Sequence, residues 1–227
     1  MSVQVATISR VPQILKTIAT LKQGEWATFR DVDWDEYEEL LAELEGNPGK
    51  RVYYNEGVLE IMSVSFAHER RKELLARMVD ILAEESEMEL IPGGSTTLKL
   101  QGLRKGAEPD ASFFLRNADL MMGKEDYDLR HDPPPDLVIE VDISHPSHSK
   151  FDLYAKLGVP EFWRYDDSRI EVYELVDGEY VERDESPIFS FVSAAELSKF
   201  LDDYHDKGQI TAIRAFREFV NSRLQTS

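Results

Sequence analysis

Two strand-like apolar runs that each carry a carboxylate at one end constrain this chain more than any other feature. The first run, residues 111–115, follows Pro109 and Asp110, and the second, residues 137–141, contains Glu140 near its end. Carboxylates placed in this way commonly bind a hard divalent cation. Each acid alone is also explained by turn or strand-end chemistry. The ordered set, completed by Lys150 downstream, favours a metal-dependent nuclease site in which the metal activates water beside a phosphate.

Length and composition indicate one globular protein. The chain has 227 residues, of which 42% are hydrophobic, and no linker divides it into comparable halves. No apolar stretch approaches the length of a membrane span, and the first ten residues lack the features of a secretory signal. The absence of cysteine excludes disulfides and thiolate metal sites and fits a reducing compartment. We therefore expect a cytoplasmic protein that does not enter the membrane.

The net charge argues against tight, non-specific binding to nucleic acid. The chain has 44 acidic and 26 basic residues, a formal charge of −18, whereas affinity for nucleic acid comes largely from Lys and Arg that neutralise phosphates. The acids are unevenly spread: residues 31–39 and 80–89 resemble solvated helix faces, while residues 68–72 are locally basic. A DNA-binding groove is thus compatible with the sequence but is not indicated by its composition.

The periodicity of the apolar residues predicts a mixed sheet flanked by helices, of the α+β or α/β class. We expect helices over about 11–21, 33–44, 67–85, 147–157, 194–203 and 211–224. We expect strands over about 52–54, 58–62, 88–91, 96–100, 110–115, 137–141, 161–165, 170–175, 179–182 and 188–191. This pattern suggests an N-terminal helical appendage (1–30), a core domain (31–192) and C-terminal helices packed on the same domain (193–227).

Several short motifs in fixed order resemble a known family. They are Gly57-Val-Leu-Glu-Ile-Met-Ser63 with His68-Glu69, Pro109-Asp110, Pro135-Asp-Leu-Val-Ile-Glu-Val141 with Ser144, Lys150 with Tyr154, and Gly158-Val-Pro-Glu-Phe-Trp163. Together they are similar to the Uma-two family of proposed endonucleases, within the PD-(D/E)xK nuclease superfamily. The resemblance spans about residues 33 to 182. It implies a restriction-endonuclease-like fold and DNA as the substrate.

The same resemblance implies the roles of individual residues. Asp110 and Glu140 would be the acidic ligands of Mg²⁺ or Mn²⁺, together with the backbone carbonyl of Val141. The superfamily lysine normally stands two residues after the second acid, where this chain has Asp142. Lys150 would take its place from a nearby helix. Asp142 shares a strand face with Glu140 and is therefore a candidate third ligand.

Three further residues have two interpretations each. Glu69 is either an additional acid of the site or an ordinary carboxylate favoured by the dipole of a helix N-terminus. His68 either acts near the site or caps the same helix. Tyr154, four residues after Lys150 and on the same helix face, either orients the lysine or packs in the core.

Other functions remain open from the sequence. The displaced lysine and the charge of −18 favour a protein that keeps the nuclease fold with weak or no activity and serves as a metal-binding or interaction module. A sugar hydrolase that uses paired carboxylates has no further support in the spacing. Because two-fold symmetry matches a DNA duplex, we also expect a homodimer.

Overall fold

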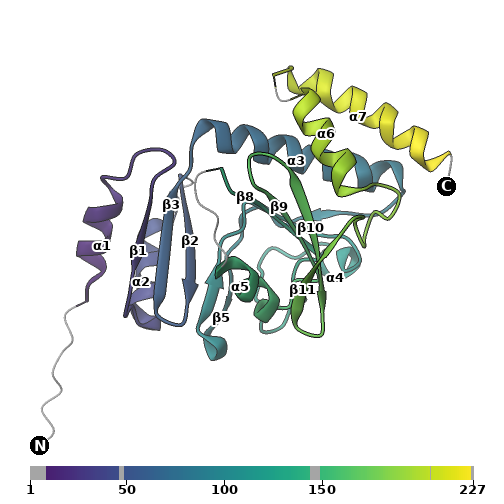
Figure 1. Ribbon diagram of the computed structural model, residues 1–227. Coiled ribbons are helices and arrows are strands. Elements are labelled where there is room, and N and C mark those ends of the chain that lie inside the picture. The colour runs from purple at the N-terminus through teal and green to yellow at the C-terminus, as the bar shows by residue number, and fades with distance from the viewer. Residues whose placement is uncertain (1–8, 46–48, 144–148, 205, 226–227) are drawn as a thin grey trace, which may run out of the picture.

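The strands of this protein form two sheets, with helices packed on and between them (Figure 1). The structure, a computed structural model, describes residues 9–45, 49–143, 149–204 and 206–225. Ser144 of the family motif and the predicted start of a helix at residue 147 lie outside these ranges. The predicted fold class, a mixed α and β protein with helices flanking a mixed sheet, is confirmed, but a second sheet accompanies the predicted one.

The first sheet, sheet A, is antiparallel with the strand order β1-β3-β2-β6-β5. Its strands are β1 (Trp26–Phe29), β2 (Lys50–Asn55), β3 (Val58–Ser63), β5 (Leu98–Leu100) and β6 (Lys105–Ala107). The helices α1 (Val11–Ile18) and α2 (Trp34–Leu44) supply apolar residues to a core cluster that includes Val52 and Tyr54 of β2. Alternate residues of a strand face opposite ways, so Arg51 and Tyr53 point to the other side of sheet A.

The second sheet, sheet B, has the order β11-β10-β9-β8-β7-β4 and is mixed, because β8 and β9 run parallel while its other pairs are antiparallel. Its strands are β4 (Ile91–Pro92), β7 (Ala111–Phe114), β8 (Leu137–Val141), β9 (Glu161–Tyr165), β10 (Ile170–Val176) and β11 (Glu179–Arg183). The helix α5 (Ser149–Leu157) connects β8 to β9 and also contacts β2 and β6 of sheet A. It therefore lies between the two sheets.

Three residues, 108–110, join β6 of sheet A to β7 of sheet B. Glu108 still belongs to sheet A, since its backbone N–H donates to the Val52 carbonyl (3.0 Å) and its side chain accepts from the Val52 N–H (3.0 Å). Pro109 follows, and Asp110 directly precedes β7. The Pro109-Asp110 motif therefore stands at the junction of the two sheets, which brings residues from both sheets to Asp110.

The long helix α3 (Phe66–Glu85) packs its apolar face against sheet B and against the C-terminal helices α6 (Ala194–Tyr204) and α7 (Gln209–Leu224) (Figure 1). Ser65 caps its N-terminus by accepting a hydrogen bond from the His68 N–H (3.2 Å). Two short helical segments, η1 (Gln101–Leu103) and α4 (Ala118–Met121), complete the fold. Within the described residues, no helix is long and apolar enough to cross a membrane.

The elements agree with the prediction except at particular places. The strand predicted over 188–191 is wrong: the chain turns there, with the Phe189 N–H bound to Ser186 Oγ (2.9 Å), and Phe189 is buried from a turn rather than from a strand. The strands β1 and β6 were not predicted. Residues 105–107 read Lys-Gly-Ala and carry no apolar alternation, so their pairing with β2 comes from the tertiary fold. The division into an appendage, a core and C-terminal helices stays a prediction.

Candidate active site

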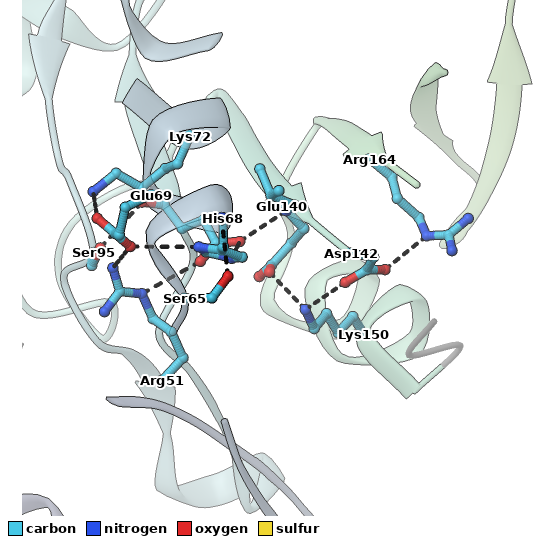
Figure 2. Close-up of polar contacts among 12 residues, drawn as sticks. Arg51, Ser65, His68, Glu69, Lys72, Ser95, Glu140, Asp142, Lys150 and Arg164 are labelled. Carbon is cyan, nitrogen blue, oxygen red and sulfur yellow. Dashed lines mark hydrogen bonds and ion pairs between the residues drawn. The ribbon is translucent and has the colours of Figure 1, made fainter. Parts of the chain in front are cut away.

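Asp110, Glu140 and Lys150 come together at the junction of the sheets, and they are almost completely buried. Asp110 enters β7, Glu140 lies on β8, and Lys150 stands in the first turn of α5. Lys150 Nζ donates to Glu140 Oε2 at 2.7 Å, as Figure 2 shows. The fold therefore brings together the three residues that the sequence singled out from separate strands and a helix.

Asp110 contacts polar groups from three parts of the chain. Its Oδ2 accepts the Val141 N–H (2.8 Å) and lies 3.0 Å from His68 Nε2. Its Oδ1 is buried, accepts no hydrogen bond from the described residues, and lies 3.4 Å from Arg51 Nε. Burial acts to raise the pKa of Asp110, but the hydrogen bond and charge of His68, the charge of Lys150 and the Val141 N–H together lower it. Asp110 is thus stabilised as a carboxylate.

Glu140 has a contrasting environment, although it is equally buried. Its Oε2 accepts from Tyr53 Oη (2.9 Å) as well as from Lys150, and its Oε1 accepts a very short hydrogen bond from Tyr154. Burial raises its pKa to about 7, Lys150 opposes the rise, and the neighbouring carboxylates of Asp110 and Asp142 add to it. A positive charge beside Glu140 therefore favours its ionised form, as Lys150 already does.

Lys150 is surrounded by acids and by one aromatic ring. Its Nζ also donates to Asp142 Oδ1 (3.0 Å) and lies 4.5 Å from the centre of the Tyr53 ring. Burial alone would lower the pKa of this amine, but Glu140, Asp142 and Asp110 outweigh burial and raise it. The raised pKa favours the charged form of Lys150, which suits this residue to stabilising negative charge rather than to acting as a general base.

The two residues at the start of α3 differ in their positions. His68 is buried against Asp110, so it contacts the site directly, and Ser65 rather than His68 supplies the helix cap. Burial acts to lower the pKa of His68, but the hydrogen bond and charge of Asp110 and the charge of Glu69 outweigh burial and raise it. Glu69 is 35% exposed and forms ion pairs with Lys72 (3.0 Å) and Arg51 (3.6 Å). It lies at the rim of the cluster, next to His68.

Sequence reasoning missed three contributors to the cluster: Arg51 and Tyr53 of β2 and Arg164 of β9. Arg51 approaches Asp110 and Glu69, Tyr53 binds Glu140, and Arg164 binds Asp142. The alternation of β2 indicates that Arg51 and Tyr53 share a face, but only the contacts of these residues with Asp110 and Glu140 of sheet B show that this face meets the site. No local motif marks Arg164, which reaches the site because β9 pairs in parallel with β8.

The donor chemistry fits a hard divalent cation. Asp110 and Glu140 provide buried carboxylates, one with an oxygen that accepts no hydrogen bond from the described residues and the other with a raised pKa. Within the described part of the chain, no three acidic or histidine side chains form a group that could hold a metal. Mg²⁺ is usually bound by only one or two carboxylates together with water and substrate phosphate, so two acids suffice.

Comparison with known proteins identifies the family of this chain. Residues 34–201 match the model of the Uma2 family, described as "Putative restriction endonuclease", and the chain belongs to this family. A crystal structure from Anabaena variabilis, of "a putative nuclease belonging to DUF820", is similar with a TM-score of 0.46 and 17% identity, over 65% of this chain and 89% of that one. No curated protein matches the sequence. The family resemblance predicted from the motifs is confirmed.

Proposed function

We propose that this protein is a metal-dependent endonuclease that hydrolyses phosphodiester bonds of DNA. The family match supports a nuclease. The observation that carries the proposal further is the convergence of Asp110, Glu140 and Lys150 in one buried cluster, in a family described as restriction endonucleases. In this proposal Asp110 and Glu140 hold Mg²⁺ or Mn²⁺, which would polarise the scissile phosphate and activate a water molecule.

The protein residues contribute charge and position. Asp110 is fixed by the Val141 N–H and by His68, so its carboxylate is oriented before substrate arrives. Lys150 stabilises the negative charge that develops on the phosphate, and Tyr53 and Tyr154 orient Glu140 through their hydroxyl groups. His68 fixes Asp110 and, when protonated, adds a positive charge beside it. A buried site of this kind strengthens each of these electrostatic effects.

The alternative is a nuclease-fold module without activity. The direct contact between Lys150 and Glu140 favours it, because an ion pair already satisfies the acid that the metal would need. The formal charge of −18 also opposes DNA binding by the protein alone. A divalent cation held by Asp110 and Glu140 would oppose both effects locally, because it would offset the charge of these carboxylates and supply a positive charge for phosphate.

Cleavage of supercoiled plasmid and of single-stranded DNA in Mg²⁺ or Mn²⁺ tests the proposal. Asp110→Asn and Glu140→Gln should each lower the cleavage rate at least about a hundredfold, as expected for loss of a principal electrostatic group, and EDTA should abolish it. Glu161→Gln is the matched control, because Glu161 is a buried carboxylate on β9 that binds Trp163 and Ser186 outside the site. Cleavage that survives both site variants would refute these assignments, and absence of metal-dependent cleavage in the wild type would favour the module.

A further inference from the structure

One face of sheet B carries a row of alternating charges that leads to Lys150. In the register of the sheet, Glu140 on β8 lies opposite Arg164 on β9, which lies opposite Glu171 on β10. Asp142 follows Glu140 on the same face. Figure 2 shows Lys150 between Glu140 and Asp142, with Arg164 on the far side of Asp142.

Both oxygens of Asp142 are used by this row. Oδ1 accepts from Lys150 Nζ (3.0 Å), and Oδ2 accepts from Arg164 Nε (2.8 Å). Arg164 Nη1 in turn donates to Glu171 Oε2 (2.8 Å), so the arginine is held from both sides. Asp142 is 7% exposed, and charge-assisted hydrogen bonds are strong in such a setting. Each oxygen of Asp142 is therefore paired with a positively charged side chain, whereas Oδ1 of Asp110 accepts no hydrogen bond from the described residues.

The row has a consequence for Lys150. A lysine side chain has about four rotatable bonds, so it loses much conformational freedom when its amine is fixed. Glu140 alone would fix the amine at one point, and Glu140 would change its contacts when it binds a cation. Asp142, anchored by Arg164, offers a partner that does not have to move.

We infer that Asp142 and Arg164 are positioning residues that hold the Lys150 amine beside Glu140, and that Asp142 is not a metal ligand. For its catalytic consequence this inference rests on the proposed nuclease function, whereas the restraint on Lys150 does not. Asp142, just after the end of β8, would thereby anchor a lysine that comes from α5.

The restraint is measured by acetylation of the native protein, with rates at single lysines followed by mass spectrometry. In Asp142→Asn and Arg164→Met, the rate at Lys150 should rise about tenfold, as expected for loss of one charge-assisted hydrogen bond. Lys105 is the internal control, because it is equally buried but is held by Asp152 (2.8 Å) and Asn55, away from Asp142. An unchanged rate at Lys150 in Asp142→Asn would overturn the inference.

Two further variants keep this test decisive. Arg169→Met removes the other arginine on Glu171 and leaves the Asp142 contacts intact, so it should not change the rate at Lys150. If Asp142→Asn loosens the whole fold, the rate at Lys105 will rise as well. Asp142→Glu then decides, because it keeps the charge but displaces the carboxylate: a rise confined to Lys150 supports the inference, and no such rise overturns it.

Metal dependence separates positioning from ligation. If Asp142 positions Lys150, Asp142→Asn should lower kcat for plasmid cleavage about tenfold, with the same half-saturating Mg²⁺ concentration and the same KM for DNA. A tenfold rise in the half-saturating Mg²⁺ concentration with unchanged kcat would show a metal ligand and overturn the inference. If the wild type cleaves no DNA, the proposed function fails, while the acetylation rates still decide whether Asp142 restrains Lys150.

Discussion

Glu140 accepts hydrogen bonds from three side chains while its own side chain has no contact with solvent. Its pKa of about 7 in the folded protein exceeds its ordinary value of 4.5, so the folded state binds more protons than the unfolded state between these pH values. The free energy of unfolding therefore falls as the pH rises through this window. An ionised Glu140 therefore lowers the free energy of unfolding near neutral pH.

Comparison of the wild type with Glu140→Gln isolates this effect. The stability of the wild type relative to the variant should fall by about 3 kcal/mol or less between pH 5 and pH 8, measured by urea denaturation at each pH. The variant removes the titration but leaves His68 and Asp110 in place. A difference that stays constant, or that grows with pH, would show that the pKa of Glu140 is not raised.

Most, but not all, of the residues in the cluster could be predicted from the sequence. Asp110, Glu140, Lys150, His68 and Tyr154 were all recognised from short motifs, and the fold places them in contact with one another or with a shared partner. Their roles in catalysis stay predictions. Arg51, Tyr53 and Arg164 belong to no motif, and their parts in the cluster follow from strand pairing over long sequence separations, which no local pattern encodes.

At the scale of elements, the two consecutive tyrosines of strand β2 face opposite sides of sheet A. Tyr53 donates to Glu140 (2.9 Å), and Tyr54 donates to the Val32 carbonyl (2.9 Å) on the other face. Tyr53→Phe and Tyr54→Phe should each cost about 1 kcal/mol of stability, but only Tyr53→Phe should change the pH dependence of cleavage. Equal effects of both variants on cleavage would contradict the assignment of Tyr53 to the site.

The unpredicted strand β6 depends on a glycine. A Cβ at Gly106 would lie 2.1 Å from Tyr37 Oη and 2.7 Å from Tyr37 Cζ, and Tyr37 is fully buried between α2 and sheet A. Gly106→Ala should therefore cost about 1–3 kcal/mol as an overpacking substitution. Gly102→Ala is the control, since no atom lies within 4 Å of its Cβ position. Denaturation midpoints that are equal for the two variants would show that Tyr37 moves aside freely.

Most elements could be predicted because their apolar periodicity is local. The hairpin β2–β3 follows from alternating residues around a two-residue turn, in which Glu56 and Gly57 both have positive φ. The split into two sheets could not be predicted, because it depends on which strands pair. Residues 188–191 were predicted as a strand because they alternate, but they form a turn. Phe189 is buried in the core from that turn.

At the scale of the whole molecule, the C-terminal helices cover α3, the helix that supplies His68. Phe216 of α7 is fully buried in the core cluster, while Arg217 forms surface ion pairs with Glu84 and Glu85. Burial rather than charge should attach these helices: Phe216→Ala should cost about 3–5 kcal/mol and Arg217→Met about 1 kcal/mol or less. Guanidinium denaturation measures both, and similar costs would contradict this view.

The charge of the whole molecule makes a divalent cation central to the proposed function. A chain with a formal charge of −18 repels DNA, so the cation at Asp110 and Glu140 would have to attract the phosphate as well as activate the water. The predicted homodimer also belongs to this scale. A light-scattering mass of twice the chain mass would support it, and the mass of a single chain at all concentrations would exclude it.

Binding of Mn²⁺ to the purified protein, followed by electron paramagnetic resonance, tests the central claim most directly. The wild type should bind Mn²⁺, and both Asp110→Asn and Glu140→Gln should weaken binding at least about tenfold, while Glu161→Gln should bind like the wild type. Equal binding by the wild type and the two site variants would contradict the claim that Asp110 and Glu140 hold the metal of a nuclease.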